Sequence, residues 1–165
     1  MLLDDYQTRS IELVIYRGFK AFEAIGSMTV FSYANRILES YGYPPGYRVA
    51  IRSSKIGPVP SDTIMTLDAT IDLEMSTDAH SILVVGAHYI ENAVIENPSI
   101  IEWIHRAAPS TPRFAALCSG AFFLAATGLL NGRRATTHWR MNDAFAKKYP
   151  EVKLDIDSIH IRVAK

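Results

Sequence analysis

The sequence has a single cysteine, no net charge and no long hydrophobic run, and each of these features excludes a class of protein. One cysteine among 165 residues rules out an internal disulfide framework and suits a reducing cytosol. The 17 basic and 17 acidic side chains cancel, so the chain lacks the positive field of a nucleic-acid-binding domain. No run of about 18 apolar residues occurs, and the opening MLLDDYQ has no basic segment followed by an apolar one. We therefore expect a cytoplasmic protein without a membrane partner.

Metal-ligand spacing is also missing. His80, His105 and His160 are scattered along the chain, and we expect neither a metal site nor a cofactor. Basic residues gather between positions 133 and 148, but they accompany no recognition-helix signature. We interpret them as a solvated basic face.

The 48% hydrophobic content predicts one globular domain over residues 1–165 with a sizeable core. The apolar run Ile11–Tyr16 is typical of a strand buried on both faces, and Gly18 ends it. A helix is predicted from Phe19 to Tyr41, with one covered apolar face. The residues predicted for that face are Phe22, Ile25, Val30, Ala34, Ile37, Leu38 and Tyr41.

Strands and helices alternate through the rest of the chain. Asn97-Pro98 predicts a helix start, with Asn97 as the cap. Further strands are predicted at Tyr47–Ile51, Ile82–Val85, Phe114–Leu117 and Arg134–Thr137, a hairpin or irregular segment over 53–70, and helices at Gly120–Thr127 and Trp139–Tyr149. One or two strands are predicted in the final segment, where Leu154, Ile156, Ile159 and Ile161 alternate with polar residues. This order predicts an α/β protein with helices on both faces of a mostly parallel sheet.

Cys118 occupies the most informative position, where an apolar strand turns directly into an apolar helix. Such a turn pushes the side chain out over the carboxyl edge of the sheet, where ligands bind in this class of fold. The start of the following helix favours a thiolate, so we expect a reactive or ligand-contacting thiol. The alternative is a small buried hydrophobic residue.

The segment from Ala116 to Trp139, which includes LCSGAFFLAATGLLNGRRATTHW, closely resembles the amino-terminal domain of one branch of AraC-family transcriptional regulators. That domain belongs to the PfpI-like, class I glutamine amidotransferase-like superfamily. The opening Tyr16-Arg17-Gly18-Phe19 and the segment 149–152 extend the similarity to nearly the whole chain.

The resemblance implies a flavodoxin-like three-layer sandwich that is usually dimeric and senses a small molecule. Related sensors recognise amino acids or quaternary amines, so we expect an effector of that kind. Such regulators bind DNA through a carboxyl-terminal helix-turn-helix domain, which is absent from this sequence. Because the chain ends at Lys165 inside a predicted strand, we expect a trimmed sensor domain.

Matching the superfamily's enzymes residue by residue gives Cys118 as the elbow cysteine, Glu23 as the acid and His138 as the nearby histidine. A protonated Glu23 could then hydrogen-bond the thiolate, and the imidazole could act as a base. From the residues alone, Glu23 could equally be a solvated helix carboxylate, and His138 a helix-capping or core-edge histidine.

Two departures from the enzyme pattern favour binding over turnover. Where the enzymes usually have paired glycines, this chain has Gly86 followed by Ala87, His88 and Tyr89, and the usual proline after the acid is replaced. Loss of one oxyanion-hole donor can cost about a hundredfold in rate. His88 and Tyr89 either line a pocket or point to solvent. The residues predicted to bind the ligand are Glu23, Gly86, Ala87, His88, Tyr89, Cys118, Ser119, His138 and Trp139.

Three functions follow from this reasoning. The first is a ligand-sensing, dimerising domain of an AraC-family regulator, whose contact with DNA would run only through the absent domain. The second is a stand-alone PfpI-like cysteine enzyme, such as an isonitrile hydratase, a glyoxalase-like enzyme or a hydrolase. The third is a purely structural dimerisation module.

Overall fold

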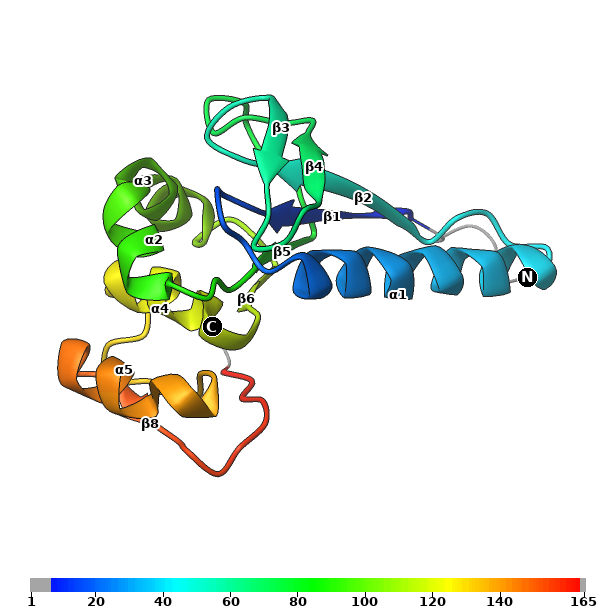
Figure 1. The fold of residues 1–165 in the computed structure, drawn as a ribbon. Helices are drawn as coiled ribbons and strands as arrows, with labels where there is room; N and C mark the ends of the chain where they lie inside the picture. Colours follow the sequence, from blue (N-terminus) through cyan, green and yellow to red (C-terminus); the bar gives the residue numbers. More distant parts are fainter. Residues whose placement is uncertain (1–6, 164–165) are drawn as a thin grey trace.

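A parallel four-stranded sheet forms the centre of the computed structural model, which describes residues 7–163 (Figure 1). The strand order is β2-β1-β5-β6. The strands span Arg9–Val14 (β1), Tyr47–Arg52 (β2), Ser81–Val84 (β5) and Arg113–Ala116 (β6). The chain leaves β1 toward β2 on one side and later runs from β5 to β6 on the other. The carboxyl ends of β1 and β5 therefore form the switch point at which such sheets bind ligands.

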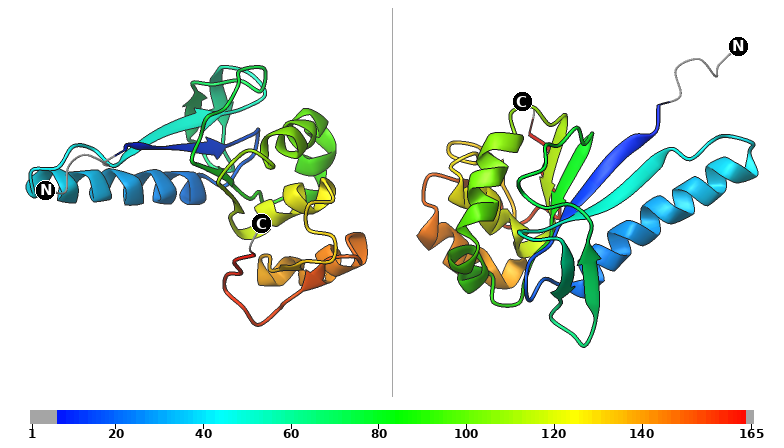
Figure 2. Two further views of the ribbon diagram at one scale, coloured as in Figure 1. Left: turned by 180° about the vertical axis from the view of Figure 1, so that it is seen from behind. Right: turned by 90° about the horizontal axis from the view of Figure 1, so that it is seen from above.

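Helices lie on both faces of this sheet, as the sequence pattern predicts (Figure 2). Helix α1 (Ala21–Ser40) packs beside β2 on one face. Helices α2 (Ile90–Glu96), α3 (Pro98–Ala107) and α4 (Ala121–Ala126) lie on the other face. The residues Leu13 and Val14 of β1 point to opposite faces and are both fully buried, which explains why this part of the strand is apolar on both faces apart from Glu12.

The segment between β2 and β5 contains the predicted hairpin. Strands β3 (Gly57–Pro60) and β4 (Thr66–Ala69) pair in antiparallel fashion. The Asn97 cap is a wrong prediction: its side chain makes no cap hydrogen bond, and its Nδ2 donates to the Ala93 carbonyl at 2.8 Å. Since α2 ends immediately before α3, its free carbonyls compete for the amide. Pro98 does begin α3.

The carboxyl-terminal part departs most from the sequence prediction. Strand β7 (Arg134–Ala135) pairs with β8 (Lys153–Leu154) in a separate two-stranded sheet and does not join the main one. A 3-10 turn at Trp139–Met141 precedes α5 (Asn142–Lys148), which buries Phe145.

No strand forms over the described residues 155–163, although one or two were predicted there. The carboxylate of Asp155 instead accepts the backbone N–H groups of Asp157 and Ser158 and pairs with Arg134, which lowers its pKa to about 2. This turn chemistry ends β8, and Lys165 lies outside the described residues.

Helix α1 also differs from the prediction, because most of its predicted core face is exposed. It projects from the body of the molecule and meets the sheet only near its start and along β2 (Figure 1). Only Ala21 and Ala24 are fully buried, whereas Phe22 is 87% exposed and Val30 66% exposed. The predicted face is the wrong one, because the small residues Ala21 and Ala24 pack on the body and most of the predicted residues lie on the opposite side of the helix.

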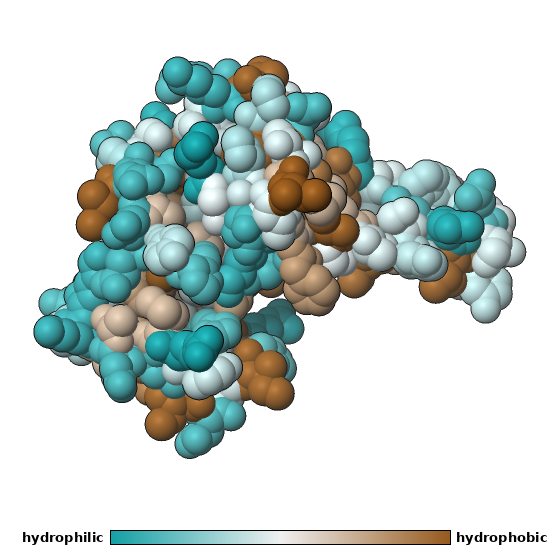
Figure 3. Space-filling model, viewed as in Figure 1, coloured by the Kyte–Doolittle hydropathy of each residue, from teal (hydrophilic) through white to brown (hydrophobic). Residues whose placement is uncertain are grey.

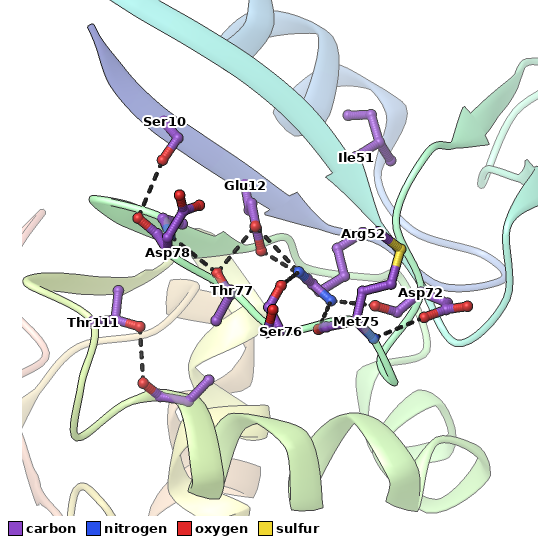
Figure 4. A network of polar contacts seen from close by, with 12 residues as sticks. Ser10, Glu12, Ile51, Arg52, Asp72, Met75, Ser76, Thr77, Asp78 and Thr111 are labelled. Carbon is purple, nitrogen blue, oxygen red and sulfur yellow. Dashed lines mark hydrogen bonds and ion pairs between the residues drawn. The ribbon is translucent and has the colours of Figure 1, made fainter. Parts of the chain in front are cut away.

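A buried ion pair ties β1, β2 and the segment after β4 together (Figure 4). Arg52 has no exposed surface, and its Nε donates to Glu12 Oε2 at 2.7 Å. Its guanidinium also donates to the carbonyls of Asp72, Met75 and Ser76 and lies 4.8 Å from the ring centre of Trp103 in α3. Every side of this buried cation is therefore contacted by protein.

Candidate functional site

Cys118 lies directly after β6, at the first position of a 3-10 turn (Cys118–Gly120) that leads into α4. Its φ of 51° is the only positive value at a non-glycine position among the described residues. Such backbone costs about 1–3 kcal/mol and is held by the surrounding structure. Gly120 allows the turn to pack against the sheet, since a Cβ there would lie 2.4 Å from the Val84 carbonyl oxygen. The predicted strand-to-helix elbow is therefore confirmed.

The Cys118 sulfur faces two charged side chains from the start of α1. Lys20 Nζ lies 3.3 Å from the sulfur, and the Glu23 carboxylate is close enough to act on the pKa of the thiol. Burial raises the pKa of the Cys118 thiol, the Glu23 carboxylate raises it further, and the contact with Lys20 opposes both effects. The predicted thiolate is thus wrong in direction: the thiol is the favoured form, because it loses hydration and can donate to Glu23. The short helix after the elbow does not outweigh these contributions.

Glu23 is held from several sides and is not the solvated carboxylate that the sequence left open. Its Oε2 accepts the backbone N–H of Gly86 at 2.6 Å, and its Oε1 lies 3.6 Å from Lys20 Nζ. Gly86 permits this approach, because a Cβ there would lie 2.5 Å from Ser119 Oγ and 3.2 Å from Glu23 Oε2. Sequence reasoning missed Lys20, although its position three residues before Glu23 is typical of a helical ion pair.

The Ser119 side chain forms hydrogen bonds with the backbone of Ala87, the residue after Gly86 in the loop that follows β5. The N–H of Ala87 donates to Ser119 Oγ at 3.2 Å, and the Ser119 hydroxyl donates to the Ala87 carbonyl at 3.0 Å. In the loop after β5, the backbone N–H groups of Gly86 and Ala87 are therefore both bound by side chains of this chain, those of Glu23 and Ser119. An oxyanion hole requires such donors to be directed at the reacting atom.

His138 and Trp139 lie beside the elbow, near Cys118. Thr137 Oγ1 donates to the Cys118 carbonyl at 3.4 Å, which fixes this segment. The His138 imidazole caps the next turn by accepting the Arg140 N–H at 3.2 Å, as in the capping alternative, and it stacks on Trp139. Desolvation, followed by the cations Lys20 and Arg140, lowers the pKa of His138. The lowered pKa favours the neutral imidazole, which is half-buried beside a largely exposed indole.

His88 and Tyr89 point outward from the loop that precedes α2. Both are exposed, and their rings meet edge to face at 4.8 Å. This is the solvent-facing alternative of the two considered, and participation in ligand binding stays a prediction for both residues.

Cys118 lines neither of two cavities in the described part of the chain. One, of about 450 Å³, lies at the amino ends of β1 and β5, at the edge opposite the elbow. The other, of about 300 Å³, lies beyond the carboxyl ends of β1 and β2. Within residues 7–163, no three His, Cys, Asp or Glu side chains converge to hold a metal ion, and no helix is long and apolar enough to cross a bilayer.

The elbow cysteine, the helix acid and the glycine loop meet at one edge of a parallel sheet, and the sequence profile of the DJ-1/PfpI family matches residues 9–154. The chain belongs to the DJ-1/PfpI family. The resemblance inferred from the segment 116–139 is thereby confirmed at the level of the family.

Relatives of this DJ-1/PfpI chain include a regulator and an enzyme. An uncharacterised protein from the cpoL 5′ region of Streptomyces lividans is 32% identical over 140 residues, which are 85% of this chain and 94% of that protein. The HTH-type transcriptional regulator CdhR of Pseudomonas aeruginosa is 28% identical over 83% of this chain, but the match spans only 39% of CdhR. The isonitrile hydratase of Pseudomonas putida is 30% identical over 60% of this chain and 43% of that enzyme.

Solved structures show the same fold. A ThiJ/PfpI family protein from Pseudomonas syringae superposes with a TM-score of 0.75 at 20% identity, covering 95% of this chain and 60% of that one. An AraC family transcriptional regulator from Pseudomonas putida superposes with a TM-score of 0.70 at 16% identity, over 93% of this chain and 78% of that one. The predicted flavodoxin-like sandwich is confirmed.

Proposed function

We propose that this chain is the ligand-sensing and dimerisation domain of an AraC-family DNA-binding transcriptional regulator and binds a small metabolite beside Cys118. Contact with DNA would run through a carboxyl-terminal helix-turn-helix domain of the native protein, and the reducing cytoplasm is where such a regulator works. The similarity to CdhR over 83% of this chain supports that role.

The observation that carries the proposal is that side chains of this chain already bind the backbone N–H groups of the loop after β5. Glu23 binds the N–H of Gly86, and Ser119 binds the N–H of Ala87. A catalyst would need these donors for a developing negative charge, whereas a binding site can keep them as fixed structure. The protonated thiol of Cys118 likewise suits contact with a ligand better than nucleophilic attack.

The exposed surface next to the elbow fits a small nitrogenous effector, an amino acid or a quaternary amine. Trp139 is 70% exposed and stacks on the neutral His138 ring. An aromatic face attracts a quaternary ammonium group, and Glu23 supplies a negative charge nearby. Binding there would bias the arrangement of the two subunits and so move the attached DNA-binding domains.

A thermal-shift titration with L-arginine, glycine betaine and choline at millimolar concentration tests this assignment. We expect at least one of them to raise the Tm, because a ligand at 100 times its Kd stabilises the folded state by about 2.7 kcal/mol. Trp139→Ala should abolish the shift, and Ile64→Ala, at a fully exposed hairpin position, should preserve it. An unchanged Tm with all three compounds contradicts the proposed effector class.

Dimerisation is assigned to α1, whose exposed apolar residues form one stripe. These residues are Phe22, Val30, Tyr33, Ile37 and Tyr41. At helical spacing they fall within roughly 120° of the circumference, on the side away from the sheet. In the view of Figure 3 the projecting part is mostly pale or teal, and its brown atoms lie along the lower edge. Soluble monomers rarely expose so long an apolar surface, and a second copy of the chain would cover it.

Light scattering after size-exclusion chromatography tests this assignment, because it gives the molar mass of the eluting species. The wild-type chain should elute as a dimer, and the double variant Val30→Glu/Ile37→Glu as a monomer, since two charges would be buried without partners. Ser32→Glu places one charge on the same helix, away from the stripe, and should remain dimeric. A wild-type monomer at micromolar concentration would refute the assignment.

A cysteine enzyme is the second candidate, and the convergence of Cys118, Glu23 and His138 on one edge favours it. The similarity to isonitrile hydratase over 60% of this chain has the same implication. This reading requires a thiolate at neutral pH, which the alkylation experiment in the Discussion measures.

A further inference from the structure

The 300 Å³ cavity beyond the carboxyl ends of β1 and β2 has the features of an anion site. It is formed by the turn after β1, the segment after β2 and strand β3, and it shares no lining residue with the Cys118 site. Its volume is at the lower end of the range for small-molecule sites. Its position at the carboxyl edge is where sheets of this class bind ligands.

Two cations line this cavity, and no carboxylate does. Arg17 follows β1, immediately before the left-handed Gly18, and Lys55 follows β2. Within the described part of the chain, neither side chain forms a hydrogen bond or an ion pair. Other cations of the sheet edge have partners: Lys20 lies against Glu23, and Arg52 against Glu12. An uncompensated pair of cations at one cavity attracts negative charge.

A hydroxyl faces the same cavity. Ser53 is only 3% exposed as a residue, and its backbone N–H donates to the Ile71 carbonyl at 3.0 Å. Its side chain lines the cavity and forms no hydrogen bond within the described part of the chain. The hydroxyl can therefore donate to an oxygen of a ligand in the cavity.

We propose that this cavity binds the phosphate group of a small phosphate monoester. The Arg17 guanidinium can hold two phosphate oxygens with paired N–H donors, Lys55 adds a second positive charge, and Ser53 donates its hydroxyl to a third oxygen. Val59 and the neighbouring prolines of β3 provide an apolar wall for the organic part. The regulator would then carry a second ligand site, independent of the effector site at Cys118.

Isothermal titration with phenyl phosphate tests the proposal on the chain as it is. Arg17→Gln and Lys55→Gln should each weaken binding about tenfold or more, which is the effect of removing one charge-assisted hydrogen bond. Ser53→Ala should weaken it by a smaller factor. Arg48→Gln, which removes an exposed cation from the amino-terminal half of β2, should leave the affinity unchanged.

Two competing ligands define the chemistry. Benzoate carries one carboxylate charge, and sulfate carries no organic part, so both should bind more weakly than phenyl phosphate. Equal affinity for benzoate would overturn the phosphate assignment. Equal losses of affinity in Arg17→Gln and Arg48→Gln would also overturn the site, because net surface charge alone would then explain the binding. Trp139→Ala tests ligand binding at the effector site, and Arg17→Gln tests phenyl phosphate binding at this cavity. Either assignment can therefore fail while the other stands.

Discussion

Replacing Arg52 with methionine is expected to lower the free energy of unfolding by about 3–5 kcal/mol, because the change leaves a buried charge without its partner. The Glu12 carboxylate accepts two guanidinium hydrogen bonds, at 2.7 and 3.2 Å, and a third from the Thr77 hydroxyl at 3.0 Å. The same substitution releases the carbonyls of the 72–76 segment. Urea denaturation followed by far-ultraviolet circular dichroism measures the loss.

The double variant Glu12→Gln/Arg52→Met should lose less than the sum of the two single variants, because each single change leaves an unpaired group that the double change removes. Arg48→Met removes an exposed cation from the start of the same strand and should change the stability by no more than about 0.5 kcal/mol. If Arg52→Met is as stable as Arg48→Met, the buried pair does not hold the segment after β4. Should Arg52→Met fail to fold, Arg52→Lys gives the same comparison at a smaller loss.

Alkylation of Cys118 by iodoacetamide is expected to be slow at neutral pH and to accelerate only above the ordinary pKa range of a thiol. Burial and the Glu23 carboxylate both raise the pKa of Cys118, and alkylation follows the thiolate fraction, which changes tenfold per pH unit below the pKa. Glu23→Gln should lower that pKa and speed alkylation at pH 8 about tenfold for each unit of pKa. Lys20→Met should raise the pKa and slow the reaction.

The raised pKa of Cys118 also makes the stability of the fold depend on pH. Since folding raises the pKa of Cys118, the thiol stabilises the fold at pH values below its unfolded pKa, and this contribution is lost as pH rises through the folded value. Glu39→Gln, an exposed change near the far end of α1, is the matched control and should not alter the alkylation profile. Rapid alkylation of the wild-type chain at pH 6 would instead establish a thiolate and make the cysteine-enzyme reading the better one.

The strands were predictable where burial is complete. Ile82–Val84 is a short apolar run, Ile11–Val14 is apolar apart from Glu12, and both lie inside the sheet with helices over them. Helix α2 escaped prediction, since its seven residues are too few for a helical period to stand out from the loop. The apolar alternation from Leu154 onward predicted one or two strands, but only Leu154 lies in one, β8, and the described residues 155–163 form none.

Some residues of the candidate site were likewise predictable from the sequence, and some of its contacts were not. Cys118 was predicted from its place between a strand and a helix, Glu23 and Gly86 were predicted from the resemblance to the superfamily, and the structure brings all three together. Lys20 against the sulfur and Ser119 against Ala87 were not found, because each contact joins segments far apart in the chain. The raised pKa of Cys118 follows from these same contacts, and local sequence carries no measure of burial.

By itself, the sequence determined the family, the alternation of strands and helices, and the cysteine at the end of β6, because local periodicity and a contiguous motif encode them. Only the tertiary structure decided which apolar faces are covered, which backbone donors are already occupied, and that Arg17, Ser53 and Lys55 line one cavity. Coverage, donor occupancy and electrostatics depend on which distant segments meet. The meeting of β1, α1 and the loop after β5 is a property of the folded chain.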